Sequence, residues 1–111
     1  MDQVNEQLLA QMVEAIVREV NPRQVYLFGS CARGEMGPDS DVDLLIIEDE
    51  PFGEKRDRHA ETGRIRGALH EFHVPKDILV FSHEEAEHWG RTLNHILAWC
   101  LREGRLLYER P

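Results

Sequence analysis

Residues 25–47 read VYLFGSCARGEMGPDSDVDLLII and contain two apolar runs joined by a loop of small, polar and acidic residues. The first run, Val25 to Phe28, predicts a short buried strand that stops at Gly29-Ser30, where small residues allow a sharp turn towards a helix. The backbone N–H groups exposed at such a helix start suit a phosphate group. The second run, Leu44 to Ile47, predicts another buried strand.

Two aspartates stand directly before the second apolar run. Asp41 and Asp43 are separated by one residue, and side chains at positions i and i+2 of a strand point to the same face. The pair therefore presents two carboxylates side by side, and their charges repel each other unless a cation binds between them. Magnesium that keeps water and substrate phosphates in its shell needs only one or two protein carboxylates. The pair thus predicts a site for a metal and a nucleotide.

The same acidic residues also match part of a calcium-binding EF-hand loop. Asp39, Asp41, Asp43 and Glu50 fall at ligand positions of that loop. However, Leu44 stands where the loop needs glycine for its sharp turn, and it opens an apolar run typical of a strand. The strand interpretation is therefore favoured.

The order Gly29-Ser30, ten residues, then Asp41-Val42-Asp43 resembles the nucleotidyltransferase signature of the DNA polymerase beta superfamily. Arg33-Gly34 and Ser40 are also similar to that family's motif. The chain most resembles the small, stand-alone minimal nucleotidyltransferases, and the resemblance extends over nearly its whole length. It implies one α/β domain over residues 1–111 with a mixed sheet of about four strands and helices packed against it.

A third aspartate, Asp77, lies one residue into a predicted strand over residues 76–81. A charged side chain on a strand expected to be buried indicates a functional role, although an edge-strand aspartate paired with an arginine also fits. If the helix before this strand is a right-handed crossover, the strands that carry Asp43 and Asp77 start at the same end of the sheet. Asp77 would then approach Asp41 and Asp43.

Family resemblance implies a role for each of these residues. In the superfamily a third aspartate completes the catalytic set, so the expected catalytic and metal-binding residues are Asp41, Asp43 and Asp77, with two magnesium ions. The expected nucleotide-binding residues are Gly29, Ser30 and Arg33. Ser30 also suits a helix cap, and Arg33 suits an ordinary surface position equally well.

The same resemblance implies magnesium-dependent transfer of a nucleoside monophosphate to a hydroxyl group, with AMP from ATP as the expected case. Minimal nucleotidyltransferases commonly pair with a small helical HEPN-type protein, and members act as type VII-like antitoxins that adenylylate a tyrosine of that toxin. Two alternatives remain open. One is a binding module that holds a nucleotide or metal and neutralises its partner by occlusion, and the other is a small-molecule transferase of the aminoglycoside-modifying kind.

The composition favours a single cytoplasmic domain. A chain of 111 residues can build one modest core, and we expect no second domain for an acceptor. The N-terminus is polar and acidic and no run of 18 apolar residues occurs, so we expect neither a signal peptide nor a membrane span. Cys31 and Cys100 make no disulfide framework, which favours a reducing compartment. A formal charge of −8 disfavours a long nucleic acid as partner, because Lys and Arg supply that affinity. A homo-oligomer is left open.

Apolar periodicity predicts two helices around the central segment. Residues 3–20 repeat apolar side chains every three or four positions, which predicts a helix that ends before Asn21-Pro22. Residues 54–71 predict a weakly apolar helix, in which Gly63 and Gly67 lower stability.

The C-terminal part predicts one more helix and a strand. Ser82 is expected to cap a continuous helix that ends at Gly104, and a short strand over residues 106–108 follows. The predicted buried stripe of this helix consists of Trp89, Leu93, Ile96, Leu97, Cys100 and Leu101. Trp99 lies off this stripe, and we expect it to project outward as an interface anchor or to pack on a second buried face.

The basic residues of the second predicted helix and two pairs of histidines suit ordinary solvent-exposed positions. The basic residues that gather in the second helix region are Lys55, Arg56, Arg58, Arg64 and Arg66. They suit a solvated helix face, with a patch for phosphate or an acidic partner as the alternative. The histidine pairs His70 with His73 and His83 with His88 are favoured as solvated side chains over metal ligands, because no cysteine or acidic partner joins them at ligand spacing.

Overall fold

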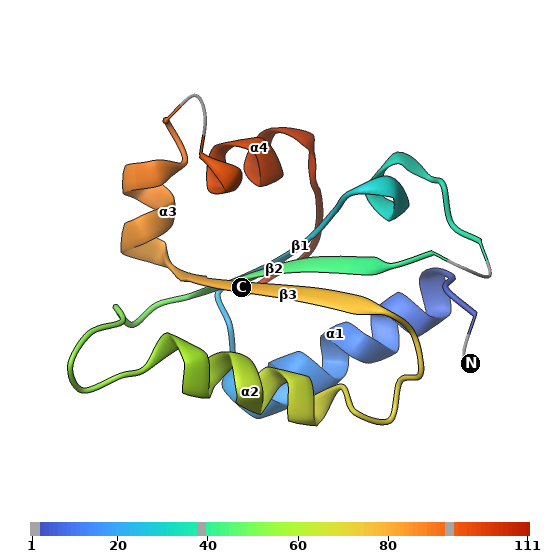
Figure 1. Ribbon diagram of the computed structural model, residues 1–111, viewed down its shortest axis with the longest axis horizontal. Helices are drawn as coiled ribbons and strands as arrows, with labels where there is room; N and C mark the ends of the chain where they lie inside the picture. Colours follow the sequence, from blue (N-terminus) through green and yellow to red (C-terminus); the bar gives the residue numbers. More distant parts are fainter. Residues whose placement is uncertain (1–2, 38–39, 93–94) are drawn as a thin grey trace.

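A four-stranded mixed β-sheet forms the centre of the molecule (Figure 1). The computed structural model describes residues 3–37, 40–92 and 95–111. The strands, in the spatial order β3-β2-β1-β4, are β1 (Gln24–Phe28), β2 (Val42–Glu48), β3 (Lys76–Ser82) and β4 (Arg105–Glu109). β1 runs antiparallel to β2 and β4, whereas β2 and β3 run parallel. The mixed sheet predicted from the sequence is confirmed.

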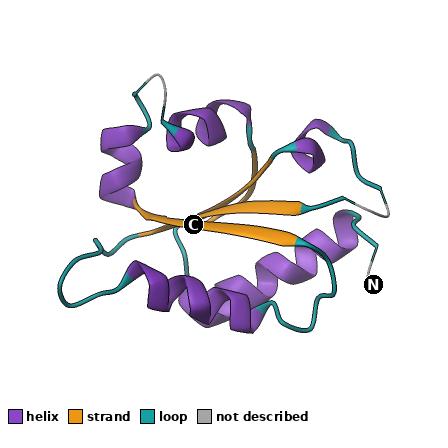
Figure 2. Ribbon diagram, viewed as in Figure 1, coloured by secondary structure: helices purple, strands orange, loops and turns teal. Residues whose placement is uncertain are grey.

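Two helical layers cover the sheet, one on each face (Figure 2). α1 (Glu6–Val20) and α2 (Arg58–Ala68) lie on one face, and α3 (His83–Trp89) and α4 (Ile96–Glu103) lie on the other. β2 is therefore buried from both sides. Leu44 and Ile46 pack in the cluster that contains the α1 side chains, whereas Leu45 and Ile47 pack in the cluster that contains Leu97 of α4.

This alternation also assigns the charged residues of β2 to faces. Asp43 has the same parity as Leu45 and Ile47, so it lies on the face covered by α3 and α4. Glu48 has the parity of Ile46, so it lies on the face covered by α1 and α2. The two acidic residues thus lie at opposite ends of one strand and on opposite faces of the sheet.

The first two helices begin later than periodicity predicts because of their caps. The Asn5 side chain accepts a hydrogen bond from Leu8 N (2.8 Å) and starts α1 at Glu6. Asp57 caps α2, which begins at Arg58 rather than near residue 54. Immediately before it, Gly53 and Arg56 pair in a tight bridge that keeps this segment out of the helix.

The predicted continuous helix after Ser82 is wrong. Ser82 does cap a helix, with a complete capping box to Glu85, but α3 ends at Trp89. A second helix, α4, starts at Ile96 after His95, whose Nδ1 accepts from Leu97 N (3.1 Å), and ends as predicted before Gly104. Of the predicted buried stripe, Leu93 falls outside the described residues, and Ile96 is 45% exposed rather than buried.

The break between these helices changes which aromatic side chain is exposed. Trp89 is 38% exposed and stacks on the ring of His95. One continuous helix predicted that it would be buried. Trp99 packs its ring edge-to-face against Phe28, at 5.9 Å between centroids, and is half-buried. The second buried face is therefore the correct alternative for Trp99.

The connection β2–α2–β3 links two parallel neighbours, so both strands start at the same end of the sheet (Figure 1). Asp77 at the start of β3 is thereby brought beside Asp43 near the start of β2.

Across the described ranges, none of the helices has the length and apolar character needed to cross a lipid bilayer.

We expect Gly63→Ala to raise the free energy of unfolding by about 0.5–1 kcal/mol, because alanine favours a helix more than glycine does. Gly63 is exposed in α2, and a Cβ atom there would meet nothing within 4 Å. Urea titration measures the effect. Gly104→Ala is the control and should lower the midpoint, since its Cβ would lie 2.3 Å from the Cys100 carbonyl oxygen. A lower midpoint for Gly63→Ala would contradict the helical assignment of this segment.

Candidate active site

A tight turn follows β1 and begins the candidate site. Gly29 has φ 75° and ψ −156°, a backbone conformation that is essentially restricted to glycine. The helix predicted after it is a single turn of 3-10 helix, η1 (Ser30–Arg33), which ends at Gly34 with φ 81°. Glu35 N donates to Ser30 O (3.0 Å) and closes the turn. The structure thus places Gly29 and Ser30 at the end of β1, next to β2.

The Asp43 carboxylate lies against this turn. Phe28 and Asp43 are register partners in the antiparallel pair β1–β2, which brings the next residue, Gly29, up to the Asp43 side chain. A Cβ atom on Gly29 would lie 2.3 Å from Asp43 Oδ2. Glycine is therefore needed at position 29 for two reasons, the backbone conformation and the space that the carboxylate occupies.

Asp43 also faces the other two predicted aspartates. Asp77 is its register partner across the parallel pair β2–β3, and Asp41 lies one residue before β2. Asp43 is half-buried, whereas Asp41 and Asp77 are exposed. Burial, followed by the negative charges of Asp77 and Asp41, raises the pKa of Asp43 above its ordinary value. The structure thus brings the three carboxylates into electrostatic contact.

Within the described residues, no basic side chain compensates the charge of these aspartates. Among residues 3–37, 40–92 and 95–111, no ion pair joins Asp41, Asp43 or Asp77 to a basic side chain. Arginines elsewhere do neutralise carboxylates, as Arg105 does with Glu6 (2.6 Å). An uncompensated, partly buried carboxylate with two like neighbours suits a bound divalent cation.

These residues fit a magnesium ion that a nucleotide also binds. Within the described part of the chain, no group of three His, Cys, Asp or Glu side chains is placed to hold a metal without further ligands. Magnesium usually keeps several waters and binds through one or two carboxylates together with substrate phosphates. The aspartates therefore suit an ion that arrives with a nucleotide better than a permanently bound structural metal.

Three hydrogen bonds link Asp41 and Ser40 to the residues of the turn. The Cys31 thiol of η1 donates to the Asp41 carbonyl oxygen (3.0 Å), so the turn and the start of β2 are linked directly. Ser40 Oγ accepts from Gly37 N (2.7 Å) and donates to the Glu35 carbonyl oxygen (3.1 Å). Sequence patterns alone did not indicate this role for Cys31. The signal that could have indicated it is an apolar-type side chain inside a polar loop, and Cys31 is indeed 1% exposed.

Arg33 is not drawn into this cluster. Its guanidinium pairs with Glu35 (3.2 Å), and more than half of each side chain is exposed. The surface position is therefore what the structure shows, and a nucleotide contact by Arg33 stays a prediction. Glu48, which could otherwise compete with Asp77 as the third carboxylate, lies at the far end of β2.

The competing metal interpretations find no support in the described residues. Leu44, where an EF-hand needs glycine, is an interior residue of β2, and Asp39 of that loop lies outside the described residues. His83 pairs with Glu87 (3.5 Å), and neither histidine pair contributes to a group of three metal-binding side chains in the described ranges.

The basic residues around α2 are largely engaged in ion pairs. Arg56 pairs with Glu48 and Glu61, Arg58 pairs with Glu85, and Arg64 contacts Glu19 (3.2 Å). These arginines therefore hold elements of the fold together, and they do not form the open basic patch that was one interpretation of the sequence.

Comparison with known families matches residues 9–98 to the nucleotidyltransferase domain. The chain belongs to this family. The match covers the Gly29-Ser30 turn and all three aspartates, and it confirms the resemblance inferred from the motif. No curated protein sequence matches the chain.

Solved structures with the same fold include three that align over most of the chain. A protein described as a nucleotidyltransferase from Sulfolobus solfataricus is 19% identical, with a TM-score of 0.64, over 94% of this chain and 79% of its own. A toxin–antitoxin structure with AMP-PNP is 18% identical, with a TM-score of 0.54, over 91% and 73%. A mutant of the MntA–HpeT toxin–antitoxin is 15% identical, with a TM-score of 0.51, over 96% and 75%. At these identities the similarity shows a shared fold.

We expect the effects of Gly29→Ala and Asp43→Ala on the free energy of unfolding to be coupled. Gly29→Ala brings backbone strain and a collision with the carboxylate, and Asp43→Ala removes the collision but leaves the strain. Gly29→Ala should therefore cost roughly 1 kcal/mol less in the Asp43→Ala background. Gly34→Ala is the control, because Gly34 also has a positive φ and a Cβ there would meet nothing within 4 Å. Equal coupling for both glycines would contradict the close approach of Gly29 to Asp43.

We expect Asp43→Asn to melt above the wild type at pH 7 without magnesium. The pKa of Asp43 is raised from 3.8 in the folded state, so its contribution to stability is full below pH 3.8 and is lost as the pH rises through the folded value. The advantage of the variant should therefore shrink below about pH 4. Magnesium at ten times its dissociation constant should add about 1.4 kcal/mol to the wild type and far less to the variant. Equal magnesium responses in thermal melts would contradict a metal role for Asp43.

Proposed function

We propose that this protein transfers AMP from ATP to a hydroxyl group in a magnesium-dependent reaction. One observation carries the proposal: the Asp43 carboxylate lies between the Gly29 turn and Asp77, with no basic side chain of the described residues paired to it. A nucleotidyltransferase needs a phosphate-binding turn beside acidic side chains that bind a metal. Membership of the nucleotidyltransferase domain family supports this assignment.

Each residue of the site has a part in the proposed reaction. The backbone at Gly29 and Ser30 holds the pyrophosphate end of the nucleotide, and the Asp41 and Asp43 carboxylates hold magnesium that enters with it. When bound, the metal neutralises charge on the phosphates and makes the attacking hydroxyl more acidic. Asp77, the register partner of Asp43, would share a second magnesium with Asp41 and Asp43, and the acceptor hydroxyl would lose its proton to water.

The proposed reaction is a single in-line displacement. The acceptor oxygen forms a bond to the α-phosphorus, the bond from that phosphorus to the β-phosphate oxygen breaks, and pyrophosphate leaves with the electron pair. Catalysis then depends on positioning and charge, because no covalent intermediate with the protein is needed. The links that fix the site, from Cys31 to Asp41 and from Gly29 to Asp43, supply that positioning.

We infer that the acceptor is a tyrosine hydroxyl of a HEPN-type toxin and that the chain acts as its antitoxin. The described residues form one sheet, two helical layers and the donor site, and we infer that the acceptor hydroxyl is brought by another molecule. Support also comes from the solved structures with the same fold, two of which are described as toxin–antitoxin complexes, one of them with AMP-PNP.

The test is transfer of label from ATP carrying ³²P at the α-phosphate, with magnesium, to the co-expressed product of the neighbouring gene. We expect Asp41→Ala and Asp43→Ala to abolish labelling with the fold intact, and Asp77→Ala to reduce it strongly. Ser30→Ala should chiefly raise the KM for ATP, because neighbouring N–H groups still contact the phosphate. Glu35→Gln, an exposed acid in the loop next to η1, is the matched control and should retain activity.

The other outcomes separate the alternatives. Full activity of Asp77→Ala would show that another acid is the third carboxylate. Neutralisation of the partner by wild type and Asp43→Ala alike, with no label transferred, would replace the enzyme with an occluding module. Robust transfer to a free aminoglycoside with no protein labelled would replace it with a small-molecule transferase.

A further inference from the structure

An aromatic side chain of α4 lies next to the candidate active site without belonging to the aspartate cluster. α4 covers the face of the sheet on which Asp43 lies (Figure 1). The ring of Trp99 packs edge-to-face on Phe28, at 5.9 Å between centroids. Phe28 is the register partner of Asp43 and directly precedes Gly29, so its side chain shares the Asp43 face. Trp99 is therefore one side chain away from both the Gly29 turn and the Asp43 carboxylate.

The neighbouring residues of α4 fix this position. Cys100, the residue after Trp99, is fully buried. Burial, and then the negative charge of Asp43, raises the pKa of the Cys100 thiol to about 11, so this residue lies within electrostatic reach of the site. At the end of the helix a Cβ atom on Gly104 would lie 3.0 Å from the Leu27 carbonyl oxygen. The helical turn that carries Trp99 is thus held against β1 and beside the start of β2.

The indole of Trp99 still has surface to offer a ligand. An edge-to-face contact covers at most one face of the ring, and the side chain as a whole is half-buried. Within the described ranges its N–H has no acceptor, and the only buried side-chain polar atom there without a partner is Glu48 Oε2, so the indole N–H reaches solvent. A tryptophan used only in the core usually finds a partner for this group. Trp99 thus combines a fixed position with an accessible, amphipathic ring.

Trp89, the other of the two tryptophans, is engaged differently. Its ring stacks on His95 at 4.9 Å, and the ring of His88 packs against it at nearly a right angle, at 4.6 Å. Trp89 belongs to α3, which begins where β3 ends, whereas Asp77 lies at the start of β3 (Figure 1). The two tryptophans therefore lie on the same side of the sheet, but only Trp99 adjoins the candidate active site.

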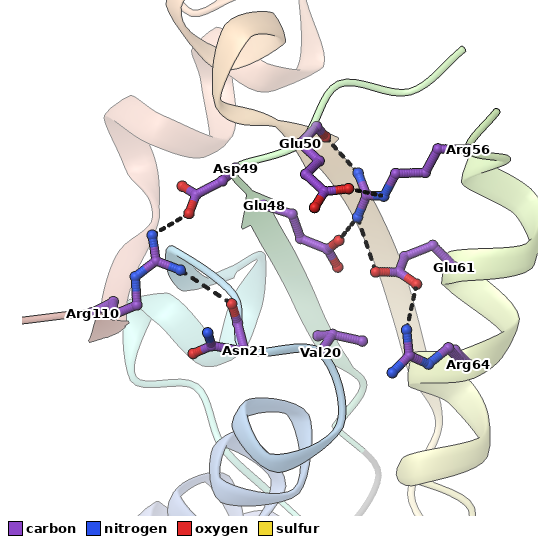
Figure 3. A pocket seen from close by; sticks show the side chains of 9 residues that line it. All are labelled: Val20, Asn21, Glu48, Asp49, Glu50, Arg56, Glu61, Arg64 and Arg110. Atoms are coloured by element: carbon purple, nitrogen blue, oxygen red, sulfur yellow. Dashed lines mark hydrogen bonds and ion pairs between the residues drawn. The ribbon is translucent and has the colours of Figure 1, made fainter. Parts of the chain in front are cut away.

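The opposite end of β2 is neutralised by the protein's own side chains. Arg56 bridges Glu48 and Glu61, as Figure 3 shows. Burial and the neighbouring Glu61 raise the pKa of Glu48 to about 8, so this pair retains a proton at neutral pH. The aspartates at the start of β2, which have no such partners among the described residues, are the more suitable place for a charged ligand.

The position of Trp99 suits the base of a nucleotide. A nucleotide whose phosphates lie at the Gly29 turn extends its base beyond them by one sugar, and Trp99 lies one side chain away from that turn. Aromatic side chains bind bases by stacking, which every base can do because each has a π-face. A purine has two fused rings and removes more apolar surface of an indole from water than a pyrimidine does. Stacking at this position therefore favours purines.

We propose that Trp99 forms the base-binding wall of the donor site, where its indole stacks on the purine base of the nucleoside triphosphate. This inference rests on the proposed transferase function, because it names a contact to the donor of that reaction. Trp99 is then a binding residue that sets the preference for purines, and no bond forms or breaks on it.

The test measures binding to the full chain by isothermal titration calorimetry with magnesium. The ligand is an ATP analogue with a methylene group between the α- and β-phosphorus, so no transfer occurs. We expect Trp99→Ala to bind it about fivefold more weakly than the wild type, or weaker still. Trp99→Phe keeps an aromatic ring and should bind within about threefold of the wild type, and the control Trp89→Ala within about twofold. The wild type should prefer this analogue to the matching UTP analogue, and Trp99→Ala should lose the preference.

Magnesium tripolyphosphate separates loss of the stack from damage to the fold, since Trp99 also packs on Phe28. This probe has no base, so Trp99→Ala should bind it as the wild type does. Asp43→Ala should bind it far more weakly, because the carboxylate that attracts the metal is missing. A purely structural role for Trp99 predicts instead that Trp99→Ala weakens both ligands equally.

Tryptophan fluorescence gives a second readout that leaves Trp99 in place. Trp89→Phe retains only Trp99, and its emission should be quenched by the ATP analogue when excited at the red edge, where nucleotides do not absorb. Trp99→Phe retains only Trp89, and its emission should stay unchanged. The measurement on Trp89→Phe decides the question even if Trp99→Ala does not fold.

The possible failures of this inference and of the transferase proposal are distinct. Equal affinities of Trp99→Ala and the wild type for the ATP analogue, equal weakening of both ligands, or quenching of Trp89 in place of Trp99 would each overturn the stacking contact alone. If the wild type bound neither the ATP analogue nor tripolyphosphate, the donor site itself would be wrong, and both proposals would be overturned.

Discussion

The close approach of the Asp43 carboxylate to the backbone of Gly29 is the constraint on which the site depends. It requires that β1 and β2 pair in one register only, since the contact exists because Phe28 lies opposite Asp43. That register is secured because β2 is buried on both faces, and a slip by one residue would turn every apolar side chain to the wrong layer. The core therefore determines where the charge lies, and glycine makes room for it.

The parts of the fold and of the site that follow from the sequence are those determined by residues close together in the chain. The two strands and the Gly29 turn were predictable because apolar runs and small residues act over a few positions. The approach of Asp77 was predictable through one topological rule, since a helix between two strands favours a parallel pair that starts at one end. Its catalytic role is a proposal.

The errors arose where distant parts of the chain compete with local patterns. Apolar spacing favoured one helix after Ser82, but α3 and α4 must both fold back onto the same face of the sheet, and the chain turns between them. This turn exposes Trp89 and sends Trp99 against Phe28. Likewise, the arginines near α2 suited a solvated helix face, with a basic patch as the alternative, and their ion pairs were not predicted because partners such as Glu85 are far away in sequence.

The two ends of β2 show opposite ways of managing buried negative charge. At its start, Asp43 has like-charged neighbours and forms no ion pair with an arginine of the described residues, so its charge stays available to an external cation. At its end, Glu48 is held by Arg56 and by a retained proton. Asp43 and Glu48 are five residues apart, about 17 Å along a strand, and the odd spacing places them on opposite faces. At this distance, with the sheet between them, a change in charge at one end of β2 has little effect on the other.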